Sequence, residues 1–152
     1  MINLGFYSGN NLPTICFRPK WVDYVLMTIA LLITLFSWFF AFYLQQQGTF
    51  VIANHLLLMI LMTVSVVGLS LLLSFAPSSY YRFPVKVTSA NLANQYLIAI
   101  RFCRVLCIWL ALLSFASILM EHKEWGIFIQ FATLFLFGIS FVTYYAIAYH
   151  YR

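Results

Sequence analysis

The feature that most constrains this chain is its longest run without charge. Residues 24–81 contain no Asp, Glu, Lys or Arg, which makes an uncharged run of 58 residues. Two further uncharged runs cover residues 105–120 and 125–151. A membrane-spanning helix needs about 20 predominantly apolar residues. The first run therefore accommodates two spans with a short turn, each later run accommodates one, and the sequence predicts four membrane-spanning helices.

Composition excludes the alternatives to a membrane protein. Hydrophobic residues make up 64% of the chain and charged residues 7%, whereas soluble domains have about 25% charged residues. A disordered chain needs a far more polar composition. A membrane β-barrel needs strands that alternate between apolar and polar residues, and residues 56–62 do not alternate. The predicted fold class is all-α, an integral membrane four-helix bundle that forms a single membrane domain over residues 1–152.

The four spans are placed by the uncharged runs and the polar turns between them. They are expected near residues 21–44, 51–75, 96–120 and 125–149, with a cytoplasmic loop at residues 76–95. Thr88 or Ser89 can cap a helix, and no helix breaker separates them from the third apolar run. We therefore expect one helix from about Ser89 to Met120, which extends the third span into the cytoplasm.

The distribution of cations predicts the orientation of the spans. The chain has eight Lys and Arg residues, and only Lys123 falls on the side of the two short turns. Cytoplasmic loops carry an excess of Lys and Arg, so both termini are expected in the cytoplasm. The net charge of +5 then requires no nucleic-acid partner. The other seven cations are interpreted as topology anchors or contacts for lipid headgroups: Arg18, Lys20, Arg82, Lys86, Arg101, Arg104 and Arg152.

Small and polar residues at helical spacing indicate which faces of the spans meet. Helices in lipid pack closely where small residues let their backbones approach. Spans one, three and four each carry such a stripe, and Ser65, Gly68 and Leu72 are candidates for span two. The predicted packing residues are Ala30, Thr34, Ser37 and Ala41, then Cys103, Cys107, Ala111 and Ser114, and finally Gln130, Thr133 and Ser140.

The residues that could carry chemistry each have a simpler interpretation. Cys103 and Cys107 lie one helical turn apart, as ligands of a soft metal can, but buried free cysteines commonly act as small apolar residues. His55 is a candidate proton relay, yet it has no acidic residue close in sequence and is expected to be hydrated. Glu121, His122 and Glu124 fall in one short turn, which is expected to be solvated. We therefore expect no metal and no cofactor.

Neither catalysis nor transport has its usual sequence mark. The chain has no recognisable catalytic motif, so it is expected not to be an enzyme. Ion pathways usually need ionisable residues inside a span, whereas the three acids of this chain fall at the ends of spans. Gln130 is the most polar candidate in the middle of a span.

The stretch before the third span resembles a known group of proteins. Residues 82–88 read Arg-Phe-Pro-Val-Lys-Val-Thr and are followed by Asn91 and then Gln95-Tyr96. This pattern resembles that of small bacterial multi-span membrane proteins of unknown function, often found in Bacteroidetes and related to the N-terminal domain of SdpI-type immunity proteins. The resemblance implies a bacterial cytoplasmic (inner) membrane location and no established activity. The turn at residues 45–50 is shorter than in that group and lacks its histidine motif, so no role passes to His55.

These observations leave three hypotheses for function. The leading one is a non-enzymatic small integral membrane protein that acts through helix–helix contacts with another membrane component, as an accessory subunit or an immunity-type factor. A small oligomeric transporter or channel would need Gln130, Arg101 or His55 to line a wet cavity. A lipid-headgroup-binding protein or enzyme would use Arg101 and Arg104 to contact phosphate. The expected partners are membrane lipids and another membrane protein or a second copy of the chain, and no nucleic acid.

Overall fold

Four long helices form most of the molecule. A computed structural model describes residues 2–8, 14–16 and 18–152, and its helices are α1 (Trp21–Gln46), α2 (Ile52–Phe75), α3 (Leu92–His122) and α4 (Gly126–His150). Each of them is long and apolar enough to cross a membrane. The prediction of four apolar helices of spanning length is therefore confirmed.

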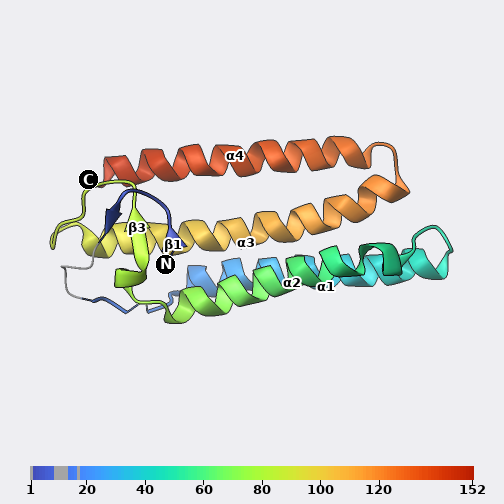
Figure 1. Cartoon of the computed structure of the whole chain (residues 1–152), viewed down its shortest axis with the longest axis horizontal. Coiled ribbons are helices and arrows are strands. Elements are labelled where there is room, and N and C mark those ends of the chain that lie inside the picture. The colour runs from blue at the N-terminus through green and yellow to red at the C-terminus, as the bar shows by residue number, and fades with distance from the viewer. Residues whose placement is uncertain (1, 9–13, 17) are drawn as a thin grey trace.

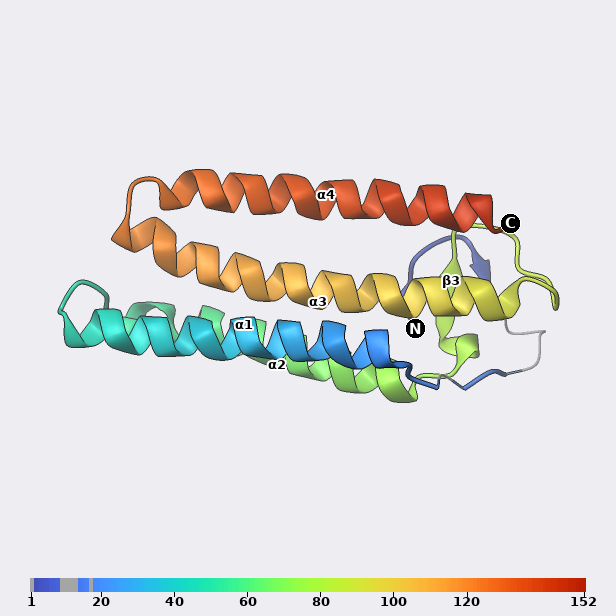
Figure 2. The same cartoon turned by 180° about the vertical axis from the view of Figure 1, so that it is seen from behind.

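Helix α3 lies at the centre of the arrangement. It packs against α4 on one side and against the pair α1 and α2 on the other (Figures 1 and 2). In the most apolar window of each helix, 50% of the residues of α3 are buried, against 11% for α4. The bundle therefore has three layers, with α4 as an outer layer that rests on α3.

The two ends of the molecule differ in what they contain. Both described ends of the chain and the segment between α2 and α3 lie at one end, and the two short turns between helices lie at the other (Figure 1). In the turn after α1, Gly48 has a φ of 71°, a left-handed conformation that glycine adopts at little cost. Seven of the eight cations belong to segments at or near the first end, and Lys123 follows α3 at the second.

A small sheet closes the end that holds the termini. Its strands are β1 (Ile2–Asn3), β2 (Tyr7–Ser8) and β3 (Tyr81–Phe83), in the order β1-β3-β2. Strand β1 runs parallel to β3 and β2 runs antiparallel to it, and a 3₁₀ turn at Ser78–Tyr80 precedes β3. Sequence analysis placed β3 in a loop and expected no strand. The pairing was missed because it joins segments almost 80 residues apart.

The bend between β1 and β2 needs a glycine. A Cβ atom at Gly5 would overlap the backbone of Phe83 and Pro84. The backbone N–H of Leu4 donates to the carbonyl oxygen of Arg82 at 3.1 Å. The bend thus lies directly against β3, and only a residue without a side chain fits there.

Two sequence predictions about the helices need correction. Helix α3 begins at Leu92 and not at Ser89, because Asn91 closes a turn before it. The Oδ1 atom of Asn91 accepts the backbone N–H of Thr88, and its Nδ2 donates to the carbonyl oxygen of Lys86. In α2, Leu72 is 64% exposed and does not face the bundle. Over residues 52–72 of α2, the buried residues are instead Ile52, Met59, Val66 and Ser70.

The size of the side chains that fill the bundle changes along its length. At its middle, small residues of three helices pack together: Ala30, Val66, Cys107 and Ala111. Larger side chains fill both ends. The cluster beneath the sheet is centred on Tyr81, Phe83, Tyr96 and Phe102, and the opposite cluster contains Leu44, Phe50, Met59 and Ile118.

Candidate functional site

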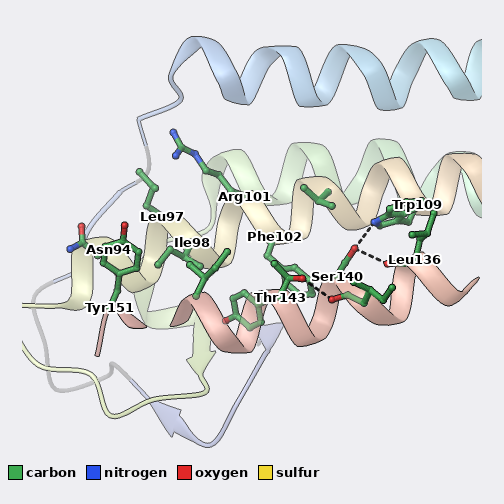
Figure 3. A pocket seen from close by; sticks show the side chains of 14 residues that line it. Asn94, Leu97, Ile98, Arg101, Phe102, Trp109, Leu136, Ser140, Thr143 and Tyr151 are labelled. Atoms are coloured by element: carbon green, nitrogen blue, oxygen red, sulfur yellow. Dashed lines mark hydrogen bonds between the residues drawn. The ribbon is translucent and has the colours of Figure 1, made fainter. Parts of the chain in front are cut away.

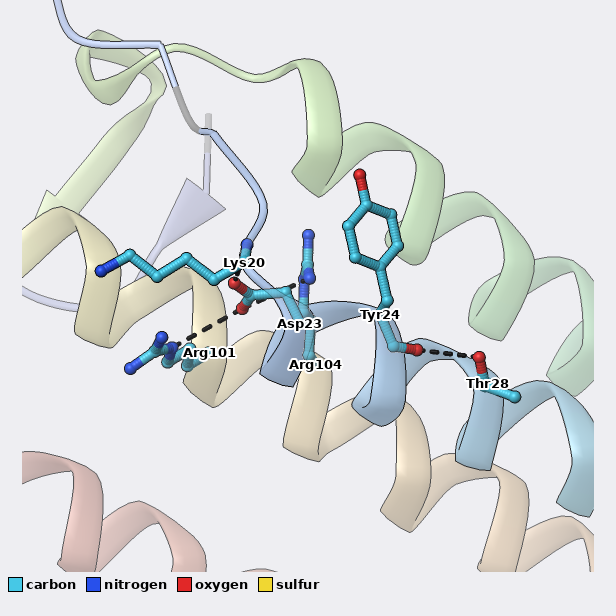
Figure 4. A network of polar contacts seen from close by, with 6 residues as sticks. All are labelled: Lys20, Asp23, Tyr24, Thr28, Arg101 and Arg104. Carbon is cyan, nitrogen blue, oxygen red and sulfur yellow. Dashed lines mark hydrogen bonds and ion pairs between the residues drawn. The ribbon is translucent and has the colours of Figure 1, made fainter.

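A buried ion pair joins α1 to α3 near the end that holds the sheet. The Oδ1 atom of Asp23 lies 3.3 Å from Nη1 of Arg104 and 3.6 Å from Nε of Arg101 (Figure 4). Asp23 is fully buried and Arg104 is 1% exposed. The other carboxylate oxygen of Asp23 accepts the backbone N–H of Lys20 at 2.8 Å, which satisfies one of the open donors at the start of α1.

This ion pair changes the interpretation of the two arginines. Sequence analysis treated both as interfacial anchors for headgroups. The structure places Arg104 inside the bundle, with its side chain 1% exposed, and leaves the side chain of Arg101 34% exposed. A charge taken out of water is costly unless an opposite charge lies beside it. Asp23 supplies that opposite charge. Arg104 therefore makes an ion pair within the bundle and is not an interfacial anchor.

A second pair joins α2 to α3 at the opposite end. Nε2 of His55 lies 2.8 Å from Oε1 of Glu121, and the ring of Phe50 stacks on the imidazole with its centroid 5.1 Å away. From the sequence, no orienting acid was evident for His55 beyond the turn that contains Glu121 and Glu124. The two residues are far apart along the chain but lie at the same end of neighbouring helices. Glu121 is therefore a partner of His55 and not only part of a solvated turn.

The predicted packing residues fall on different surfaces of the bundle. Those of α1 and α3 are buried, and Ala30 packs with Cys107 and Ala111. In α4, Thr133 is buried, whereas Gln130 and Ser140 are half-buried. The hydroxyl of Ser140 accepts a 2.8 Å hydrogen bond from Nε1 of Trp109. The predicted packing residues of α1 and α3, all of which are buried, are Ala30, Thr34, Ser37, Ala41, Cys103, Cys107, Ala111 and Ser114.

The remaining predicted anchors lie on the surface. Arg18, Lys20, Arg82, Lys86 and Arg152 are all exposed. They belong to the segments before α1, between α2 and α3, and after α4, which gather at the same end of the molecule (Figure 1). Five exposed cations therefore surround the end that holds the sheet.

A long groove runs between α3 and α4. Its volume is about 610 Å³, and both helices line it over most of its length (Figure 3). Its walls are mainly apolar and include Leu97, Ile98, Val105, Ile139 and Ile147. A volume of this size is in the range of pockets that hold small molecules. Sequence analysis did not anticipate the groove, because it depends on how α4 sits against α3.

A second, more polar hollow adjoins one end of this groove. It has a volume of about 620 Å³ and lies between the turn that precedes α3 and the end of α4. The residues that line it are Lys86, Thr88, Ala90, Asn91, Asn94, His150, Tyr151 and Arg152. We call the first hollow the α3–α4 groove and the second the cationic cup. Asn94 and Tyr151 line both, so the two hollows adjoin at these residues.

Gln95 fixes the end of α4 at this junction. Its Nε2 donates to the carbonyl oxygens of Ala148 at 2.8 Å and of Tyr151 at 3.1 Å. The last carbonyls of a helix have no partner within the helix. The buried amide of Gln95 supplies one, and it holds the last turn of α4 beside the first turn of α3.

Among the described residues, no three His, Cys, Asp or Glu side chains come together as a metal site requires. Cys103 and Cys107 are buried free thiols within the packed face of α3, and Cys16 is an exposed free thiol. The strongest candidate sites are therefore the α3–α4 groove with its cup, and the outer surface of α4.

The fold and these sites describe a multi-pass membrane protein with four apolar helices. Comparison of the chain with protein-family models, with curated proteins and with solved structures finds no match.

Proposed function

We propose that this chain is a non-enzymatic protein of the bacterial inner membrane that binds another membrane protein through helix–helix contacts, as an accessory subunit or an immunity-type factor. The observation that carries this proposal is the position of α4. Among the described residues, α3 is the only helix with an extensive contact to α4. A helix with one neighbour leaves most of its surface for a partner or for lipid.

The exposed surface of α4 has a feature suited to another helix. Gly138 lies at the middle of α4 on an exposed face, and a Cβ atom there would meet nothing within 4 Å. The chain's own packing thus does not require a glycine at this position, although glycine weakens a helix by about 1 kcal/mol relative to alanine. In membranes, glycine lets a second helix approach closely. Phe135 and Val142, both 70% exposed, flank it on the same face.

The distribution of charge supports an orientation for this protein. Seven of its eight cations lie at or near the end that holds the sheet, and Lys and Arg concentrate on the cytoplasmic side of membrane proteins. In the proposed orientation both termini and the sheet face the cytoplasm. Little of the molecule then extends beyond the bilayer, which favours a partner that is reached within the membrane.

Crosslinking within the native membrane tests the partner. A photoreactive residue at position 142 should crosslink to a second membrane protein, and the same residue at position 57, on the exposed face of α2, should not. The substitution Gly138→Leu should abolish the crosslink from position 142. Gly68→Leu is the matched control, because a Cβ atom at Gly68 also meets nothing within 4 Å.

Three outcomes would contradict the proposal. If position 142 crosslinks only to lipid, α4 is simply the outer helix of the bundle. If Gly138→Leu and Gly68→Leu reduce the crosslink equally, the central glycine of α4 is not the contact. A crosslinked species of twice the mass of the chain would identify a second copy as the partner and would exclude the accessory-subunit role.

A further inference from the structure

The α3–α4 groove and the cationic cup have complementary chemistry. The groove is walled by aliphatic side chains from both helices and follows α3 from Asn94 to Trp109 (Figure 3). The fifteen helical steps from Asn94 to Trp109 extend about 22 Å, which exceeds the roughly 15 Å depth of one leaflet of the hydrocarbon core. The groove is therefore long enough to hold a membrane acyl chain over the full depth of a leaflet.

The cup provides positive charge at one end of the groove. Lys86 and Arg152 line it, and no residue that lines either hollow has a carboxylate side chain. Within the described part of the chain, neither cation makes an ion pair. Both side chains are exposed, so their donors are accessible to a headgroup phosphate.

The backbone around the cup adds to this preference for an anion. The first turn of α3 begins beside it, and the N-terminal end of a helix carries partial positive charge. The last turn of α4 also lies there and would oppose this effect. Gln95, however, occupies two carbonyl oxygens of that turn with its amide. The side chain of Arg101 points from the groove toward α1 (Figures 3 and 4), where it pairs with Asp23, so Arg101 is not needed for the headgroup.

We infer that the α3–α4 groove and the cationic cup together bind one anionic phospholipid, with an acyl chain in the groove and the headgroup phosphate between Lys86 and Arg152. Because the two hollows adjoin at Asn94 and Tyr151, an amphiphile that occupies both fits them better than a free anion. The absence of carboxylate side chains from the lining selects an anionic headgroup over a zwitterionic one. This site is separate from the Gly138 face of α4 and does not depend on the proposed partner.

Lipid retention by the full chain tests this inference. The protein is exchanged into detergent with equal amounts of phosphatidylglycerol and phosphatidylcholine, and bound lipid is counted by native mass measurement. We expect one phosphatidylglycerol per chain and little phosphatidylcholine. The double variant Lys86→Gln with Arg152→Gln should weaken the binding of phosphatidylglycerol about thirtyfold, because each cation near a membrane surface contributes roughly fivefold to the affinity for an anionic lipid. Lys123→Gln, at the opposite end, should retain the lipid.

A second pair of variants tests the groove. Thr143 lines the groove, whereas its neighbour Val142 faces away from it on the same helix, and both are exposed. Thr143→Phe should fill the groove and reduce the retained phosphatidylglycerol at least fivefold. Val142→Phe adds the same aromatic ring outside the groove and should leave retention unchanged.

Several results would overturn the inference. Equal retention of the two lipids would show that the cup does not select charge. Equal effects of Thr143→Phe and Val142→Phe would show that no acyl chain occupies the groove. Displacement of phosphatidylglycerol by inorganic phosphate at matched concentration would mean that the cup binds a free anion. All substituted side chains are exposed, and a thermal unfolding curve for each variant confirms that the fold is intact before lipid is counted.

Discussion

Nε2 of His55 lies 2.8 Å from Oε1 of Glu121, and this contact joins the first turn of α2 to the last turn of α3. It lies at the end of the molecule opposite the sheet, beside the aromatic ring of Phe50. The two side chains are 31% and 40% exposed. Solvent therefore screens the pair, and its contribution to stability is expected to be modest.

A double-mutant cycle measures this pair. We expect His55→Ala and Glu121→Ala each to lower the free energy of unfolding slightly, with a coupling energy of about 0.2–1 kcal/mol between them. High salt should reduce the coupling. Unfolding in mixed micelles gives the four free energies. Glu124→Ala is the control for a carboxylate of the same turn, and a coupling between His55 and Glu124 as large as that with Glu121 would contradict the pairing.

Much of the helical framework could be predicted because it depends on local properties of the chain. The uncharged run at residues 24–81 is long enough for two helices that cross a bilayer, and most of α1 and all of α2 lie there. Helix ends depend on single hydrogen bonds. The side chain of Asn91 moves the start of α3 past Ser89 in this way.

The candidate sites were harder to predict because they join distant segments. Nothing in the periodicity of α1 or α3 states that Asp23 faces Arg104, or that β3 pairs with residues near the start of the chain. The α3–α4 groove likewise depends on α4 resting on α3 alone. The sequence did contain one signal for this ion pair. An acid and two arginines lie near the same ends of two spans, and a charge that becomes buried needs an opposite charge beside it.

Removing one partner of the buried pair of Asp23 and Arg104 should lower the free energy of unfolding strongly. Replacing both partners with apolar residues should lower it much less. Asp23→Leu leaves Arg104 buried without its counter-charge and should lower the free energy of unfolding by about 3–5 kcal/mol. Adding Arg104→Met should recover most of that loss, because two apolar side chains can fill the same space. Unfolding of Asp23→Leu and of the double variant in mixed micelles checks this. Lys20→Ala, an exposed neighbour, should have little effect, and a double variant no more stable than Asp23→Leu would contradict the pairing.

Two glycines of α4 should respond to alanine in opposite ways. A Cβ atom at Gly126 would overlap the backbone of Leu119 and Met120, whereas one at Gly138 would meet nothing within 4 Å. Gly126→Ala should therefore separate the ends of α3 and α4 and lower the unfolding temperature. Gly138→Ala should raise the stability of the isolated chain by up to about 1 kcal/mol, since alanine favours a helix over glycine. Thermal unfolding of both variants distinguishes these outcomes, and equal shifts would show that α3 and α4 do not meet at Gly126.

The hydroxyl of Tyr81 should make the fold sensitive to alkali. Tyr81 is fully buried beneath the sheet, outside the four long helices, and burial raises the pKa of its phenol well above the ordinary value of 10.0. Above pH 10 the unfolded chain releases this proton while the folded chain retains it. The unfolded state then binds fewer protons, so the free energy of unfolding falls as pH rises, by up to about 1.4 kcal/mol per pH unit.

Tyr81→Phe should keep its stability at pH 7 and lose less of it above pH 10. The control is Tyr80→Phe, because Tyr80 is adjacent and 56% exposed. A loss of stability in alkali that Tyr80→Phe relieves as much as Tyr81→Phe would assign the effect to ionisation elsewhere in the chain.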